Sequence, residues 1–314
     1  MKKDYGRIGV LMGGPSAERE VSIRSGKAIL EALLSKGYDA RPVELGMPTK
    51  EELKSLGIDT AFIALHGTFG EDGQIQAMLE ELNIPYTGSK VKASRLGMDK
   101  VASRKLFEKN RLFVPRYEVL TSPSPFPLPK GERIKERGIS QQIVVKPSAQ
   151  GSSVGVTIAE KQKELEEAID KAFGFGDAVI LEEFIEGKEL TVGILDDKPL
   201  PVIQLVPKRR FYDEVAKYTS GMTEYLVPAP ISKMESDMAQ DAAIRAHKCL
   251  GCASFSRVDM ILSREERIIV LEVNTIPGMT QLSLLPKAAS AAGMGFAELC
   301  ERMLRSADRD GEKT

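Results

Sequence analysis

Short apolar runs alternate with helical patterns over the first hundred residues. Ile8–Met12 is an apolar run, and the glycine-rich turn after it leads into a helical pattern that stops at Gly37. Ala61–Leu65 is a second apolar run. This alternation predicts a parallel sheet with helices on its faces. Ligands bind beyond the carboxyl ends of such strands, which is where Gly13 and His66 fall.

The pattern of apolar positions changes near residue 98 and again near residue 187. After 98 it predicts a helix to about residue 110, strands over 142–146, 154–158 and 178–185, and a helix over 161–173. After 187 it predicts strands over 189–195 and 201–206, a helix over about 236–250, and a β-hairpin over 257–274. We therefore expect an N-terminal α/β domain (1–97), a central α+β subdomain (98–186) and a C-terminal α+β subdomain (187–314).

The composition is that of an ordinary globular protein. Of the 314 residues, 42% are hydrophobic and 28% are charged, and the formal net charge is −1. Proteins that neutralise many nucleic-acid phosphates have a basic excess, so nucleic-acid binding is not expected. No apolar run approaches the roughly 20 residues of a membrane span, and the first residues lack the apolar core of a secretory signal. We therefore expect a cytoplasmic protein without a membrane partner.

The three cysteines, Cys249, Cys252 and Cys300, are odd in number, which argues against a disulfide framework. Cys249 and Cys252 form a CxxC pair, but no second pair completes a zinc site. Redox chemistry and plain helix packing both explain such a pair, and helix packing is the preferred interpretation.

The hairpin over residues 257–274 shows the strongest chemical pattern. Side chains alternate between the two faces of a strand, so Arg257 and Asp259 share one face, as do Glu272 and Asn274. With a turn centred between residues 265 and 266, the expected pairs are Asp259–Glu272, Arg257–Asn274, Val258–Val273 and Met260–Leu271. One face of the hairpin is then apolar, and the other presents two carboxylates, a carboxamide and a guanidinium.

The polar face of this hairpin is a candidate metal site. Carboxylate and amide oxygens suit Mg²⁺, which usually takes few protein ligands together with substrate phosphates. The three oxygen ligands would be Asp259, Glu272 and Asn274. The alternative is a solvated face with a surface ion pair. The apolar strands and the segment 275–280 that follows favour the metal site.

Three further segments have the composition of anion or substrate sites. Lys146 ends a strand before the turn Gly151–Gly155, whose amides and glycines suit phosphate oxygens, although a simple hairpin explains the turn as well. The segment Glu182–Ile185 follows an apolar strand, and its main chain is a candidate for contact with an adenine edge. Glu18 lies in the first turn of a helix, where it either compensates the helix dipole or holds a substrate ammonium.

Eight motifs span nearly the whole chain in a fixed order. They are GGPSAEREVS (13–22), ALHGTFGEDG (64–73), IPYTGS (84–89), MDK (98–100), VVKPSAQGSSVG (144–155), FYDEVAKY (211–218), SRVDMIL (256–262) and LEVNTIPGMT (271–280). Together they resemble the D-alanine D-alanine ligases of the ATP-grasp superfamily. The resemblance implies an α/β ATP-grasp fold, in which an N-terminal parallel-sheet domain binds substrate and two α+β subdomains clamp ATP. It also implies a homodimer that uses ATP and Mg²⁺ or Mn²⁺, two ions per site, to ligate two D-alanine molecules through an acyl phosphate, for peptidoglycan precursor synthesis.

The resemblance assigns a role to each matching residue. ATP would be bound by Lys100, Lys146, Glu182, Glu183, Phe184, Ile185, Glu189 and Lys217, and the metal ions by Asp259, Glu272 and Asn274. Glu18 would hold the ammonium of the first D-alanine, close to Ser152, Tyr218 and His66. Arg257 and the amide of Gly278 would stabilise the oxyanion, and Ser283 and the amide of Leu284 would bind the carboxylate of the second D-alanine.

Two segments depart from the family pattern. Glu214-Val215 precedes Ala216-Lys217-Tyr218 where the family often has an aromatic followed by glutamate, and Ala149-Gln150 stands where Arg-Glu is common. Because water would hydrolyse an acyl phosphate, we expect the segments 151–155 and 208–221 to close over the site.

Three alternative functions stay open. A sister ligase would take D-lactate or another D-amino acid as its second substrate. An ATP-binding sensor would need no oxyanion donor, so Arg257 argues against it. An α/β protein that only binds amino acids would leave Lys146 and the metal face unexplained.

Overall fold

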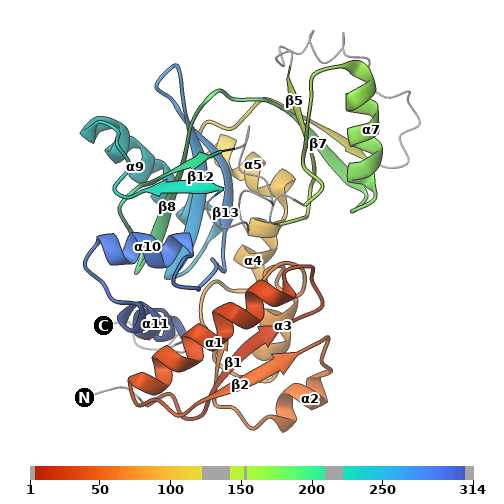
Figure 1. Cartoon of the computed structure of the whole chain (residues 1–314). Coiled ribbons are helices and arrows are strands. Elements are labelled where there is room, and N and C mark those ends of the chain that lie inside the picture. Colours follow the sequence, from red (N-terminus) through yellow and green to blue (C-terminus); the bar gives the residue numbers. More distant parts are fainter. Residues whose placement is uncertain (1–3, 122–141, 152–153, 209–221, 308–314) are drawn as a thin grey trace.

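The computed structural model describes residues 4–121, 142–151, 154–208 and 222–307. Its strands form three separate sheets, which follow one another along the chain (Figure 1). The first is parallel, as the alternation of apolar runs and helices predicts, and the other two are antiparallel. The three sheets fall within residues 8–63, 117–183 and 187–274.

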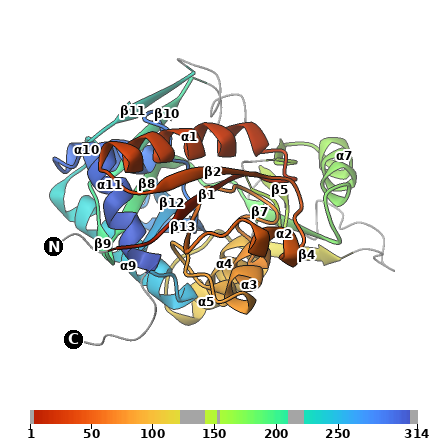
Figure 2. The same ribbon diagram turned by 90° about the horizontal axis from the view of Figure 1, so that it is seen from below.

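The N-terminal sheet has the order β2-β1-β3. Its strands are β1 (Ile8–Gly13), β2 (Ala40–Leu45) and β3 (Thr60–Ile63), and the helices of this part are α1 (Arg19–Ser35), α2 (Lys50–Ser55), α3 (Gln74–Glu81) and α4 (Val91–Met98). Figure 2 shows α1 along one face of the sheet, with α3 and α4 on the other side. The sequence pattern did not predict β2, because three of its six positions are exposed and its apolar run is interrupted.

The central sheet has the order β4-β7-β5-β6. Its elements are β4 (Tyr117–Thr121), β5 (Ile143–Pro147), β6 (Thr157–Ala159), α7 (Gln162–Phe173) and β7 (Ala178–Glu183). The strand predicted at 154–158 begins only at Thr157, since the chain is still turning at Val154 and Gly155.

The third sheet has the order β11-β10-β8-β12-β13, and β9 pairs with β8. Its elements are β8 (Gly187–Leu195), β9 (Lys198–Pro199), β10 (Ile203–Pro207), β11 (Thr223–Leu226), α9 (Lys233–Leu250), β12 (Phe255–Ser263) and β13 (Ile268–Asn274). Helix α9 begins three residues earlier than predicted. Ser232 accepts a hydrogen bond from the amide of Glu235, and the Glu235 side chain accepts one from the Ser232 amide, so a capping box fixes this start.

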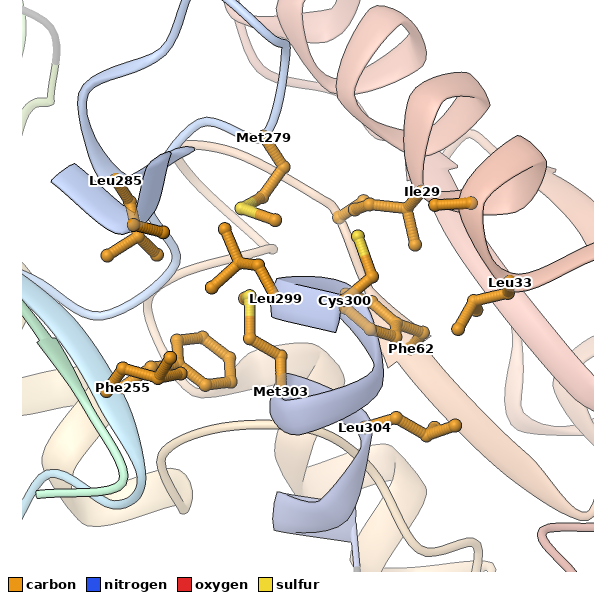
Figure 3. Close-up of a cluster of buried hydrophobic side chains, with 14 of the residues drawn as sticks. Ile29, Leu33, Phe62, Phe255, Met279, Leu285, Leu299, Cys300, Met303 and Leu304 are labelled. Carbon is orange, nitrogen blue, oxygen red and sulfur yellow. The ribbon is translucent and has the colours of Figure 1, made fainter. Parts of the chain in front are cut away.

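The last helices are α10 (Leu284–Ala291), which packs against β8, and α11 (Phe296–Leu304), which packs against α1. A 3₁₀ turn (Arg305–Ala307) follows and contacts β3. Leu299, Cys300 and Met303 of α11 are buried together with Ile29 of α1 and Phe62 of β3 (Figure 3). The first and last parts of the chain therefore share one hydrophobic core.

Helix α5 (Lys100–Lys109) joins the core of the third sheet. Its Phe107, and Leu112 just after it, are buried with Val192 and Val270. The segment after residue 98 thus packs partly with the third sheet, and the boundaries at 97/98 and 186/187 stay a prediction. In the described part of the chain no helix is both long and apolar enough to cross a membrane.

The hairpin register is as predicted over its polar half. Arg257 lies opposite Asn274, and Asp259 lies opposite Glu272. The predicted pairing of Met260 with Leu271 is wrong, because the register shifts after Asp259 and Met260 pairs with Val270. A β-bulge of this kind leaves one residue unpaired and turns its side chain. Leu271 is therefore only half-buried and lines a cavity, whereas Val270 is fully buried in the core.

Candidate active site

The site consists of two adjoining cavities of about 400 Å³ each. The first lies between the two antiparallel sheets, and the second lies at the carboxyl end of the N-terminal sheet. The first is lined by residues of the central and third sheets, and the second by residues of the N-terminal part and of the segment that leads into α10. Lys100 and Glu272 line both. A ligand that fills the first cavity can therefore meet a ligand in the second at this pair of residues.

The structure brings together all the predicted site residues that it describes. The first cavity is lined by Lys146, Glu182, Glu183, Phe184, Ile185, Glu189 and Asp259. The second is lined by Glu18, His66, Arg257, Asn274, Gly278, Ser283 and Leu284. Ser152, Lys217 and Tyr218 lie outside the described residues. The same holds for residues 152–153 and 209–221 of the two segments expected to close over the site.

The paired strands β12 and β13 hold three oxygen donors on one face. Asp259 and Glu272 are directly opposite each other, and Asn274 follows two residues later on the same face. The carboxylates are partly exposed, at 22% and 28%. Within residues 4–121, 142–151, 154–208 and 222–307 no three His, Cys, Asp or Glu side chains gather as a cation site. The third donor here is thus the carboxamide of Asn274, which also accepts a hydrogen bond from the Ile276 amide at 3.0 Å.

Arg257 and Asp259 form a two-pronged ion pair. Arg257 Nε donates to Asp259 Oδ1 at 2.8 Å, and Nη2 donates to Oδ2 at 2.7 Å. The hydroxyl of Thr191 on β8 also donates to Asp259 Oδ1, at 2.6 Å. Two parallel bonds of this kind fix both side chains in orientation. The guanidinium and the carboxylate are thereby held at the edge between the cavities.

Lys100 is held by three elements. Its main chain begins α5, where the Asp99 side chain caps the helix by accepting from the amides of Val101 and Ala102. Its ammonium donates to the carbonyl oxygen of Gln150 at 2.6 Å and lies 3.1 Å from Glu272 Oε2. The lysine thus joins α5 to the glycine-rich turn and to β13.

Lys146 shares the carboxylate of Glu182 with Arg104. Lys146 Nζ contacts Oε1 of Glu182, and Arg104 Nη2 contacts Oε2. Burial lowers the pKa of Lys146 to about 8, although Glu182 raises it. Burial also opposes ionisation of Glu182, but Arg104 and Lys146 outweigh it and hold the pKa of this carboxyl below its ordinary value. The result is a buried cluster of two cations and one anion beside the first cavity.

The segment after β7 is fixed by neighbouring strands. The amide of Glu183 donates to the Arg116 carbonyl at 3.0 Å, and the amide of Phe184 donates to the Gln142 carbonyl at 3.1 Å. The Glu183 carboxylate accepts from Arg116 Nε at 2.7 Å. Glu189 lies on β8 between Leu205 and Ile261. This segment forms one wall of the first cavity.

Glu18 and His66 lie at the carboxyl end of the N-terminal sheet. Glu18 precedes α1, and a side chain at Gly67 or Gly151 would come within about 3 Å of its Oε2. The buried His66 is 3.3 Å from Glu71 Oε1 through Nδ1 and 3.2 Å from Ser25 Oγ through Nε2. Burial raises the pKa of Glu71, and the nearby Glu18 raises it further, although His66 lowers it. Of the two carboxylates that the N-terminal part contributes to the second cavity, Glu18 is thus more exposed than Glu71.

The start of α10 forms the opposite wall of the second cavity. Ser283 is the N-cap, so the amide of Leu284 lies at the positive end of the helix. Ser283 Oγ accepts from the Thr280 amide at 3.1 Å and lies 2.9 Å from Thr280 Oγ1. A Cβ at Gly278 would come within 3.1 Å of Ser283 Oγ. The turn and the helix start are therefore closely packed around a place suited to an anion.

Glu71, Arg104 and Arg24 also belong to this region, although the sequence motifs assigned them no role. Glu71 lies in the matching segment 64–73 but had no assigned role, and Arg24 of α1 lines the second cavity. Arg104 is fully buried. The signal for Arg104 was its helical position, because residues 100, 104 and 107 form one face of α5 and that face is buried.

Comparison with known proteins agrees with this site. The family model described as "D-ala D-ala ligase C-terminus" matches residues 106–305, and the model described as "D-ala D-ala ligase N-terminus" matches residues 46–89. This chain belongs to the D-alanine–D-alanine ligase family. A relative in this family, the D-alanine–D-alanine ligase of Syntrophotalea carbinolica, is 47% identical over 96% of each chain.

Solved structures of the family have the same fold. The D-alanine–D-alanine ligase of Bacillus anthracis complexed with ATP aligns with a TM-score of 0.82 and 33% identity over 97% of this chain and 99% of that one. The VanG D-Ala:D-Ser ligase of Enterococcus faecalis aligns with a TM-score of 0.81 and 28% identity over 98% and 100%. The ATP-grasp fold expected from the sequence is confirmed.

Proposed function

We propose that this protein joins two D-alanine molecules into D-alanyl-D-alanine at the junction of its two cavities. Membership of the D-alanine–D-alanine ligase family gives the reaction class, an ATP-dependent ligation that serves peptidoglycan precursor synthesis. The observation that supports the location is the meeting of the two cavities at Lys100 and Glu272. A phosphoryl donor in the first cavity would there face a carboxylate in the second.

The first cavity is the proposed nucleotide site. Lys100 and Lys146 would bind phosphate oxygens, and the wall formed by Glu182–Ile185 and Glu189 would contact the base and the sugar. Lys217 belongs to the same proposal by its place in the family motif. Apolar side chains such as Val144 and Leu271 also line this cavity and suit the faces of a purine ring.

The hairpin donors fit magnesium or manganese ions, of which we propose two. Asp259, Glu272 and Asn274 supply hard oxygen ligands on one face, and divalent ions of this kind take few protein ligands beside substrate phosphates. When bound there, the ions would neutralise charge on the phosphates. Both carboxylates already have a cationic neighbour, Arg257 for Asp259 and Lys100 for Glu272, so these side chains are oriented before any ion arrives.

The second cavity is the proposed D-alanine site. Glu18 would hold the ammonium of the first D-alanine, with His66 in the same cavity. Ser152 and Tyr218 belong to this proposal by their place in the family motifs. Ser283 and the amide of Leu284 would bind the carboxylate of the second D-alanine at the start of α10.

The proposed reaction has two steps. A carboxylate oxygen of the first D-alanine attacks the γ-phosphorus of ATP, ADP leaves, and an acyl phosphate forms; positioning and neutralisation of charge by the lysines promote this step. The neutral amine of the second D-alanine then attacks the activated carbonyl. The oxyanion that forms would lie beside Arg257 and the amide of Gly278, and its collapse expels phosphate and leaves the new amide bond.

The deciding experiment measures phosphate release from Mg-ATP with D-alanine, with L-alanine, with D-alanine plus D-lactate, and with D-alanine plus D-serine. Products are identified by mass spectrometry. Phosphate released in step with D-alanyl-D-alanine is the expected result. Release that requires D-lactate or D-serine would give the chain the sister specificity, and ATP binding without turnover of any pair would contradict the ligase proposal.

A homodimer and a cytoplasmic location belong to the same proposal, since they are typical of the family. Light scattering on the purified protein tests the dimer, because a monomer mass would contradict it.

A further inference from the structure

Arg104 is a buried cation that the proposed reaction leaves without a role. It is the largest fully buried side chain of the described residues, with no exposed surface. Burying a guanidinium is costly unless it is paired. Its Nη2 contacts Glu182, and its Cζ lies over the ring of Tyr117, 5.1 Å from the ring centre. Nε and Nη1 have no hydrogen-bond partner within the described part of the chain.

The carboxylate of Glu182 lies between two cations from different elements. Arg104 comes from α5 and contacts Oε2, whereas Lys146 comes from β5 and contacts Oε1. Lys146 and Glu182 line the first cavity, and Arg104 stands behind them. The cluster therefore has two positive charges and one negative charge, and the side chain that faces the cavity with the surplus charge is Lys146.

Without Arg104, Lys146 and Glu182 would form a closed neutral pair. A phosphate would then compete with the carboxylate for the only ammonium in the cluster. With Arg104 present, one oxygen of Glu182 is already bound and the whole cluster stays positive. Charge of this kind, in a site removed from water, strengthens the attraction for an anion.

We propose that Arg104 is a positioning residue for the nucleotide, which acts through Glu182 to keep Lys146 oriented toward the first cavity and the cluster positively charged. The proposal rests on the proposed function in one respect, that Lys146 binds the phosphates of ATP. It assigns Arg104 no contact with the substrate.

The pH dependence of ATP use gives a readout that a purely structural role would not change. Lys146 is faced by Glu182 from β7, by Arg104 from α5 and, farther away, by Glu272 from β13. Burial lowers the pKa of Lys146 to about 8, and Arg104 lowers it as well, whereas Glu182 and Glu272 raise it. Removal of Arg104 therefore raises the pKa of Lys146, and removal of the Glu182 charge lowers it.

The test compares Arg104→Met, Arg104→Lys and Glu182→Gln with the full-length protein. In Arg104→Met we expect KM for ATP to rise about tenfold or more, the change that follows truncation of one partner of a buried charge pair, with a smaller change in kcat. Arg104→Lys keeps the charge and should stay within about threefold of wild type. Lys105→Met removes the same charge from the exposed neighbouring position of α5 and serves as the matched control.

The alkaline limb of kcat/KM for ATP, which reports the free enzyme, is then followed in each variant. It should move to higher pH in Arg104→Met, to lower pH in Glu182→Gln, and stay in place in Arg104→Lys and Lys105→Met. The proposal would be overturned by an unchanged KM for ATP in a folded Arg104→Met. It would also be overturned by alkaline limbs that shift in the same direction in Arg104→Met and Glu182→Gln. If Arg104→Met does not fold by circular dichroism, Arg104→Gln, which removes the charge but keeps a polar side chain, takes its place in both measurements. Failure of wild type to hydrolyse ATP with D-alanine would contradict the proposed function instead, so the two failures are distinguishable.

Discussion

Lys100 and Glu272 form an ion pair of 3.1 Å between the start of α5 and β13, at the place where the two cavities meet. Lys100 also binds the carbonyl of Gln150 beside the glycine-rich turn. The pair thus connects the three parts that a phosphoryl transfer between the cavities would use: the hairpin, the glycine-rich turn and helix α5.

Glu272→Gln removes one proposed metal ligand and the charge that faces Lys100. We expect kcat to fall by about 10- to 100-fold and the Mg²⁺ concentration for half-maximal rate to rise, because a carboxamide binds a hard cation more weakly than a carboxylate. Phosphate release measured against Mg²⁺ concentration checks this. Glu265→Gln, in the exposed hairpin turn, should behave as wild type. An unchanged Mg²⁺ midpoint in Glu272→Gln would remove this residue from the metal site.

Glu18→Gln removes the charge proposed to hold the ammonium of the first D-alanine. The loss of a charged hydrogen bond predicts a rise of roughly 10- to 100-fold in KM for D-alanine, whereas KM for ATP should not change because Glu18 lines only the second cavity. Initial rates at varied D-alanine and, separately, at varied ATP give the two KM values. Glu20→Gln, exposed in the first turn of α1, is the control. An equal rise in both KM values would point to a general disturbance of the site.

Arg257→Lys tests the proposed oxyanion donor. Lysine keeps the positive charge but cannot make the two parallel bonds to Asp259 or present the same donor to the oxyanion. We expect kcat to fall by about 10²–10³ while KM for ATP changes little. Arg267→Lys, in the hairpin turn, controls for the substitution itself. A twofold change is roughly what a surface substitution causes. A rate within about twofold of wild type in the same phosphate assay would therefore contradict the assignment of Arg257 as oxyanion donor.

His247→Gln tests a buried histidine away from the cavities. His247 lies 2.8 Å from Ser256 Oγ and 3.0 Å from Asp197 Oδ1. Burial lowers its pKa below the ordinary 6.5, although Asp197 raises it. The unfolded chain therefore binds a proton near pH 6.5 that the folded chain does not bind. The stability that neutral His247 contributes is lost as pH falls below this value.

Urea denaturation at about pH 7.5 and about pH 5.5 measures this effect. The variant loses two hydrogen bonds, so its free energy of unfolding should be lower than that of wild type at both pH values. The decrease in this free energy from the higher to the lower pH should, however, be smaller in the variant than in wild type. A loss equal to that of wild type would show that His247 does not contribute to the acid sensitivity.

Local patterns in the sequence determined much of the site. The alternation of residues along 257–262 and 268–274 placed Asp259 opposite Glu272 and Arg257 opposite Asn274, because side-chain direction in a strand has a period of two. The same reasoning missed the bulge that displaces Leu271. One extra residue in a continuous apolar run does not change the pattern of apolar and polar residues, so the run does not indicate a bulge. The motifs gave the family, and the matching residues that the structure describes line the two cavities.

Only the tertiary structure decided which distant charges meet. The sequence places Arg104, Lys146 and Glu182 on three separate elements, and no periodicity within any of them shows that one carboxylate is shared by two cations. The packing of α11 against α1, which joins the ends of the chain in one core, was equally absent from the sequence analysis. The spacing of hydrophobic residues along a helix or strand indicates which of its faces is buried. It does not record which other element covers that face, because that choice depends on the summed packing of the whole chain.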